Sequence, residues 1–160
     1  MNSLNDLYAW CRQQRWWIVA AVAVMSAGAV LGSLYFSQIK GLTPCELCWF
    51  QRIFIYPVPI ILIMAGYRKD KKGYLYALPL VIICLLIALY HVSIQTDPNL
   101  ATTCGGGESC TDEPAFWFSW LSIPLASALM STGMAGLLGL LALSDRSATI
   151  TGKTSKKSKK

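Results

Sequence analysis

The sequence predicts an all-α integral membrane protein, a bundle of four transmembrane helices with both termini in the cytoplasm. Three observations predict this fold class: the composition, four long apolar segments and a one-sided distribution of basic residues. The 160 residues are 54% hydrophobic and only 14% charged, with a mean hydropathy of +0.46, whereas soluble domains carry about 25% charged residues. The length suits one domain. The composition argues against intrinsic disorder and, despite a net charge of +6, against nucleic-acid binding.

Each apolar segment is long enough to cross a membrane as a helix, because a hydrocarbon core of about 30 Å requires about 20 helical residues. The segments comprise residues 16–39, 49–67, 74–92 and 121–143. The first is longer than the apolar region of a cleaved signal peptide, so we expect a retained helix. Prolines within the later segments are tolerated because neighbouring membrane helices compensate for the lost backbone hydrogen bonds.

The basic residues orient this bundle. Twelve of the 14 lysines and arginines lie on the side shared by the two termini and the loop between the second and third segments: Arg12, Arg15, Arg68, Lys69, Lys71, Lys72, Arg146, Lys153, Lys156, Lys157, Lys159 and Lys160. Only Lys40 and Arg52 belong to the other side. Because cytoplasmic loops are enriched in Lys and Arg, both termini are predicted to be cytoplasmic.

The predicted orientation divides the chain into three parts. Residues 1–15 form a cytoplasmic N-terminus, and residues 16–143 form the four-helix transmembrane domain, with outer loops at about 40–48 and 93–120. Residues 144–160 form a basic cytoplasmic tail in which lysines alternate with serine and threonine. We expect this tail to be disordered, with its lysines solvated.

The orientation also sorts the six cysteines. Cys11 is cytoplasmic, and Cys84 lies within an apolar segment where a thiol behaves as a small hydrophobic group. The remaining four form one pair in each outer loop: Cys45 and Cys48, then Cys104 and Cys110. The outer side of a prokaryotic plasma membrane is an oxidising compartment where disulfides persist. Four cysteines permit three pairings, and the residues alone leave the pairing open.

The first pair forms the motif Cys45-Glu46-Leu47-Cys48. A structural disulfide across so short a loop would restrict the unfolded chain little, and a zinc site would need the second pair close by. The spacing therefore favours redox exchange between dithiol and disulfide. Thr43 as N-cap, Pro44 as first helical residue and Glu46 in a capping box predict a helix start here, where unpaired N–H groups favour a thiolate.

Two further polar residues are predicted to lie near this pair. Arg52 follows Cys48 by four residues, so Cys45, Cys48 and Arg52 share one helix face. His91, the only histidine, lies near the outer end of the third segment, at about the depth of Cys48. A snorkelling arginine and an ordinary hydrogen-bonded histidine are the alternatives. Together these residues suit an apolar electron acceptor that becomes anionic on reduction, such as a membrane quinone.

The string Pro44-Cys45-Glu46-Leu47-Cys48-Trp49-Phe50-Gln51-Arg52 at the head of the second of four spans resembles the DsbB family, disulfide bond formation protein B. The second cysteine pair before the last span completes this resemblance. It covers about residues 16–143, and the short chain and compact second loop are most similar to BdbC-type members.

The resemblance implies a quinone-dependent thiol oxidase that acts on a thioredoxin-fold partner of the DsbA type. The partner would attack Cys104, and Cys110 would resolve the mixed disulfide through an inter-loop disulfide with Cys45. Cys48 would be left as the thiolate that donates charge to the quinone or forms a transient adduct with it. Arg52 and His91 match the quinone-contacting residues of the family. The implied protein is a monomer without a metal, in contact with membrane lipid and the quinone pool, with either ubiquinone or menaquinone as acceptor.

Two alternatives to this function remain at the level of sequence. One is a non-enzymatic protein of four spans whose loops carry structural disulfides. The other is an enzyme similar to vitamin K epoxide reductase, which also combines a four-helix core with two cysteine pairs. That family places its C-x-x-C at the head of the last core helix, whereas this chain has it at the second span.

Overall fold

The computed structural model describes residues 2–97 and 122–157, with side chains described for residues 6–97 and 122–148. The elements within these ranges are helices: α1 (Asn2–Gln13), α2 (Arg15–Leu34), a π-helical turn η1 (Tyr35–Ile39), α3 (Glu46–Ile55), α4 (Pro57–Tyr67), α5 (Tyr74–Thr96) and α6 (Ile123–Lys157). Four helical stretches are long and apolar enough to span a membrane: Arg15–Ile39, Glu46–Tyr67, Tyr74–Thr96 and Ile123–Ala148. The four-span fold is therefore confirmed.

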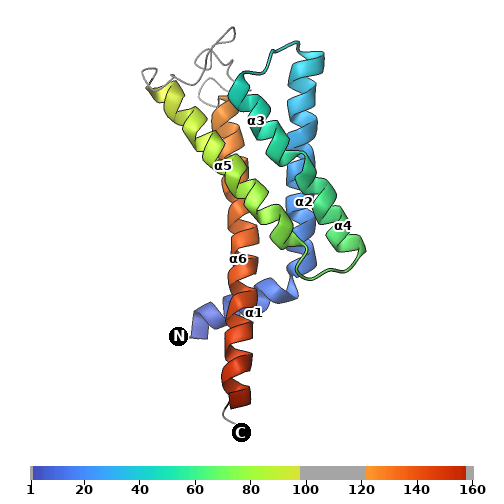
Figure 1. Ribbon diagram of the computed structural model, residues 1–160, viewed down its shortest axis with the longest axis vertical. Helices are drawn as coiled ribbons and strands as arrows, with labels where there is room; N and C mark the ends of the chain where they lie inside the picture. Colours follow the sequence, from blue (N-terminus) through green and yellow to red (C-terminus); the bar gives the residue numbers. More distant parts are fainter. Residues whose placement is uncertain (1, 98–121, 158–160) are drawn as a thin grey trace.

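Helices α3 and α4 together form the second span, with Tyr56 between them. Pro57 begins α4 and has no N–H to donate, so the hydrogen-bond ladder is interrupted there. The N–H of Tyr56 still donates to the carbonyl of Arg52 at 3.0 Å, which keeps the chain helical up to the proline. The span is thus continuous in direction although it is divided into two helices, as Figure 1 shows.

The core runs along the centre of the bundle, where side chains from four helices meet. Its fully buried members include Val22 of α2, Val58 and Leu62 of α4, Val81 of α5 and Leu138 of α6. The outer surface is also apolar, with large hydrophobic side chains exposed on each span: Leu31, Ile60, Leu86 and Leu129. Such a surface is unfavourable in water but suits hydrocarbon.

The two ends of the bundle differ in what they carry (Figure 1). Both termini and the turn between α4 and α5 lie at one end, and the connection from η1 to α3 lies at the other. Helix α1 crosses α6 at the first end. The basic side chains Arg12, Arg15 and Arg68 thus share an end with both termini.

Helix α6 extends further than the sequence analysis expected. Residues 144–160 were expected to be disordered, whereas α6 continues to Lys157. Ser144 is fully buried, and Asp145 pairs with Arg15 of α2. Residues just beyond the predicted end of the span therefore pack against other helices, and this packing allows the helix to continue.

A charged cluster joins three helices at this end. The guanidinium of Arg15 binds Asp145 through two hydrogen bonds of 2.8 and 2.5 Å and donates a third to the carbonyl of Lys71. The hydroxyl of Tyr74 donates to the same carboxylate at 2.9 Å. The side chains of Arg15 and Asp145 are 11% and 24% exposed, so the pair is mostly shielded from water and links α2, α5 and α6.

We expect Asp145→Asn to lower the free energy of unfolding by about 2–3 kcal/mol, because it leaves the Arg15 guanidinium without its counter-ion in a poorly hydrated place. Tyr74→Phe removes one hydrogen bond and should cost about 1 kcal/mol. Unfolding in detergent micelles, followed by circular dichroism, measures both. Arg146→Gln changes one charge at the exposed neighbouring position and should stay within about 0.5 kcal/mol of the parent. Equal stabilities of the Asp145 and Arg146 variants would contradict this role of the pair.

Candidate active site

The connection between η1 and α3 delivers Cys45 to the start of α3. Gly41, two residues after the first span ends at Ile39, has a φ of +69°, a left-handed conformation that glycine adopts readily. Cys45 then takes an extended conformation (φ −64°, ψ 169°) as the N-cap of α3. The predicted N-cap at Thr43 is therefore wrong, and no side-chain capping bond is present. The helix begins later because of tertiary contacts: the extended backbone at Cys45 directs its sulfur toward Cys48 and toward His91 of α5.

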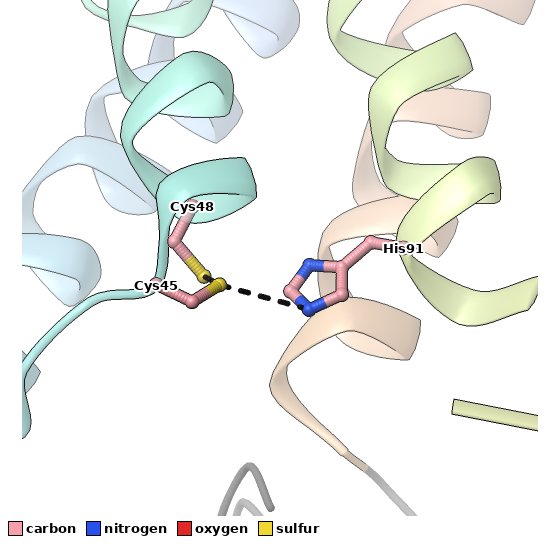
Figure 2. Close-up of side chains that lie close together, drawn as sticks. All are labelled: Cys45, Cys48 and His91. Carbon is pink, nitrogen blue, oxygen red and sulfur yellow. Dashed lines mark hydrogen bonds between the residues drawn. The ribbon is translucent and has the colours of Figure 1, made fainter. Parts of the chain in front are cut away.

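Cys45 and Cys48 lie in direct contact. Their sulfur atoms are 3.2 Å apart, with Cys48 in the first turn of α3 (Figure 2). Cys45 is only 2% exposed, whereas Cys48 is half-buried. The pair is thus close enough to exchange between dithiol and disulfide with little movement of the backbone.

His91 of α5 approaches the pair from across the bundle. Its ring is fully buried, and its Nε2 lies 3.8 Å from the Sγ of Cys45, as Figure 2 shows. His91 was predicted to lie at about the depth of Cys48, and the structure brings its imidazole to this cysteine pair.

These neighbours favour the thiolate of Cys45. The hydrogen bond with Cys48 lowers the pKa of the Cys45 thiol, burial opposes this, and the hydrogen bond with His91 lowers it again, to about 4. Reduced Cys45 is therefore anionic at neutral pH. The family resemblance assigns a thiolate to Cys48 in a different state, the one in which Cys45 is held in an inter-loop disulfide.

Gln51 is a site residue that the sequence analysis missed. Its Nε2 lies 3.5 Å from Nδ1 of His91, and its Oε1 accepts a 2.6 Å hydrogen bond from Ser127 of α6. Because the amide oxygen of Gln51 accepts from Ser127, the amide N–H of Gln51 faces Nδ1 of His91. The ring proton of His91 is therefore on its own Nε2, which points at Cys45. The spacing of three residues from Cys48 to Gln51 is the signal that could have placed Gln51 on this face.

Arg52 lies on α3 four residues after Cys48, and its guanidinium reaches the neighbouring helix. Its Nη2 donates to the carbonyl of Ser33 on α2 at 3.0 Å, a contact that the sequence did not predict. Its guanidinium also lies over the ring of Trp49, 5.3 Å from the centroid. Its Nε is buried without a hydrogen-bond partner among the described residues. Arg52 therefore has one buried N–H within the second span that no described residue accepts.

The second cysteine pair, Cys104 and Cys110, lies outside the described residues. Its predicted role as the partner-facing pair stays a prediction. What the structure assembles is one half of the predicted relay: Cys45, Cys48 and His91, with Gln51 and Ser127 behind them.

Comparison with known proteins relates the chain to disulfide formation proteins. A family model described as disulfide bond formation protein DsbB matches residues 13–141. The chain is 37% identical to disulfide bond formation protein C of Bacillus subtilis over 115 residues, 71% of this chain and 79% of the relative. It is 39% identical to probable disulfide formation protein C 2 of Bacillus cereus over 110 residues, 68% of this chain and 79% of the relative. No solved structure matches the chain. The predicted resemblance, including that to BdbC-type members, is confirmed.

We expect the thiolate absorbance of the reduced protein to rise with a midpoint near pH 4, because Cys48 and His91 lower the pKa of Cys45. An ordinary thiol would titrate near about 8.5. Ultraviolet absorbance against pH measures this in a Cys104→Ser, Cys110→Ser background, which removes the second pair.

Two variants test whether the transition near pH 4 belongs to Cys45. Cys45→Ser should abolish it, whereas Cys11→Ala, at a buried thiol in α1, should leave it in place. The absence of any thiolate transition near pH 4 in the background protein would contradict the assignment.

Proposed function

Because the chain belongs to the DsbB family of disulfide bond formation proteins, we propose that it is a membrane thiol:quinone oxidoreductase that re-oxidises a DsbA-type, thioredoxin-fold partner. Family membership implies a membrane protein with a disulfide-generating role. The observation that carries the finer proposal is the contact of Cys45 with both Cys48 and buried His91 at one end of a four-span bundle.

The proposed setting is the plasma membrane of a prokaryote, with both termini in the cytoplasm and the cysteines at the outer side. The basic ends of the spans support this orientation, because Arg12, Arg15 and Arg68 share the end that carries both termini (Figure 1). Cys45 follows the connection at the opposite end. The positive-inside rule then directs the cysteine end outward, into the compartment where disulfides form.

The proposed relay begins with the partner's dithiol. A partner thiolate attacks Cys104 of the Cys104–Cys110 disulfide and forms a mixed disulfide, and Cys110 leaves as a thiolate. Cys110 then attacks Cys45 of the Cys45–Cys48 disulfide, forming the inter-loop disulfide and releasing Cys48. The partner's second thiolate attacks the mixed disulfide, so the partner leaves as a disulfide and Cys104 leaves as a thiolate. Cys104 then attacks Cys110 of the inter-loop disulfide, which restores the Cys104–Cys110 disulfide and releases Cys45. Re-formation of the Cys45–Cys48 disulfide would deliver two electrons to a bound quinone, and the two thiol protons of the partner balance its reduction.

The geometry supports the part played by Cys45. A thiol of low pKa is a good leaving group in disulfide exchange, and Cys48 and His91 lower the pKa of Cys45 to about 4. Cys45 can therefore be displaced readily from an inter-loop disulfide. His91 holds its N–H toward this sulfur, and Gln51 maintains the ring in that tautomer.

A quinone fits the residues beside this pair. Such a molecule needs an apolar surface for its ring and tail and a donor for its carbonyl oxygen. The Nε of Arg52 is a buried donor without a partner among the described residues, and Trp49, Phe50 and Ile53 present apolar surface on the same helix. A bound quinone, ubiquinone or menaquinone, would be the two-electron acceptor. Arg52 would bind and orient it.

We expect Cys48→Ser to reduce quinone turnover to background, because the first pair can then no longer form a disulfide. The assay uses the purified full chain in detergent, a reduced thioredoxin-fold oxidase of the DsbA type and ubiquinone-1 or a short-chain menaquinone, followed by quinone absorbance. Cys11→Ala, at the opposite end of the bundle, is the control and should retain the parent rate. A normal rate in Cys48→Ser would instead support loops that carry structural disulfides.

Arg52→Ala should raise the KM for quinone by roughly 10-fold, the loss of one charge-assisted hydrogen bond of about 1.5 kcal/mol. The parallel measurement is thermal unfolding, which should change less than it does in Asp145→Asn. Lys40→Ala is the matched control, because Lys40 is the other basic residue of the outer side and is exposed. An unchanged KM in Arg52→Ala would remove this residue from the quinone site.

A further inference from the structure

We propose that Cys45, Cys48 and His91 in the reduced protein form a binding site for Zn²⁺, and that the bound ion inhibits quinone reduction. The ligand atoms of these three residues all lie within 4.8 Å of one another. The sequence predicted no metal, because a zinc site built on Cys45 and Cys48 was expected to need the second cysteine pair close by. The structure supplies a third ligand from α5 instead.

The distances between the ligand atoms match a tetrahedral zinc site. Zinc lies about 2.3 Å from sulfur and about 2.0–2.1 Å from imidazole nitrogen, so two bound sulfurs are about 3.8 Å apart and sulfur and nitrogen about 3.5 Å. The Sγ atoms of Cys45 and Cys48 are 3.2 Å apart, and Cys45 Sγ is 3.8 Å from His91 Nε2. The two sulfurs would move apart by about 0.6 Å, and His91 Nε2 would move about 0.3 Å closer to Cys45. The separation of Cys48 Sγ from the imidazole, within 4.8 Å, would become about 3.5 Å, so side-chain movements of about 1 Å or less complete the three bonds.

The chemistry of the donors selects the ion. Two thiolates and one imidazole are soft and borderline ligands, which favour zinc over magnesium or calcium. Zinc has no redox chemistry of its own, so it would not exchange electrons with the thiolates. Three protein ligands leave a fourth position for water, as in zinc sites that remain accessible. Binding releases the thiol protons still present on the pair.

The residues behind His91 can serve the metal-bound state as well. Zinc at Nε2 moves the ring proton to Nδ1, which then needs an acceptor, as metal-bound histidines usually have. Gln51 can supply it by turning its amide so that Oε1 faces the ring. Ser127 then accepts from the amide N–H, since a hydroxyl both donates and accepts. The buried contacts of Gln51 with His91 and Ser127 stay satisfied in both states.

The metal would bind only the dithiol, because sulfurs joined in a disulfide offer no thiolate. Bound zinc would thus hold Cys45 and Cys48 reduced and block their return to the disulfide. Metal binding is independent of the proposed function, whereas inhibition rests on it.

The binding test uses Co²⁺ as a spectroscopic probe and Zn²⁺ as its competitor. The protein is the full chain in detergent, reduced, with Cys104→Ser and Cys110→Ser so that the second pair cannot bind. We expect one Co²⁺ per chain with intense sulfur-to-cobalt bands that Zn²⁺ abolishes. Cys48→Ser should weaken binding at least 100-fold, and Gln51→Leu by roughly 10- to 100-fold through loss of the acceptor for Nδ1. Gln51→Glu, which keeps an acceptor for Nδ1, should retain the binding that Gln51→Leu loses. Cys11→Ala, outside the site, is the control and should bind as the background protein does.

Several outcomes would overturn the site. They are an absence of sulfur-to-cobalt bands, binding that survives Cys48→Ser, and equal binding by the oxidised protein. Circular dichroism of each variant shows that the helices remain folded, and Cys48→Ser replaces a half-buried thiol by a group of similar size.

A second arm separates this site from the proposed function. With the parent chain, micromolar Zn²⁺ should slow quinone reduction at least 10-fold, and a chelator should restore it. Turnover unchanged by saturating zinc would overturn the proposed inhibition. Cobalt bands in a chain that never reduces quinone would support the metal site and refute the proposed function. Quinone reduction by a chain without cobalt bands would support the proposed function and refute the metal site.

Discussion

In hydrocarbon, backbone polar groups must be satisfied within the protein, and this constraint explains where the reactive sulfur lies. Along a membrane helix, each N–H is already bonded to a carbonyl of the same helix. Only the first turn has N–H groups without such partners, and there the helix dipole favours negative charge. Cys45 is the N-cap of α3, at the junction between the outer connection and the second span. Its position thus combines a favourable place for a thiolate with exclusion of water.

The two ends of the bundle differ in the groups that stabilise buried charge. At the end that carries the termini, Arg15 and Asp145 neutralise each other and Tyr74 completes the carboxylate's hydrogen bonds. That arrangement joins helices and leaves nothing reactive. At the other end, Cys45 faces Cys48 and His91, and both lower the pKa of its thiol through hydrogen bonds, to which His91 adds an electrostatic attraction. No carboxylate is among the described contacts of this sulfur, so its anionic form depends on a thiol and an imidazole, groups that can themselves exchange protons.

A buried polar chain connects that sulfur to the interior of the bundle. His91 comes from α5, Gln51 from α3 and Ser127 from α6, so three helices must keep their positions for the contacts to form. Both His91 and Gln51 are shielded from solvent, where a lost hydrogen bond is costly. The same residues can hold either ring nitrogen of His91 protonated. This freedom is what makes the site compatible both with a sulfur partner and with a metal ion at Nε2.

The four spans and the shared end of the two termini could be predicted from the sequence, because hydropathy and loop charge are properties of neighbouring residues. The cysteine spacing predicts a redox pair on the same grounds, and His91 was expected at the level of Cys48, where it lies beside the pair. The contact of His91 with Cys45, the position of Gln51 and Ser127 behind it, and the bond from Arg52 to Ser33 on α2 could be seen only in the folded chain. The tertiary structure also moved the N-cap from Thr43 to Cys45 and extended α6 to Lys157. The physical reason is that an apolar helix has no polar face to set its rotation: length and hydropathy define how deep a residue lies, whereas packing between helices defines the direction in which its side chain points.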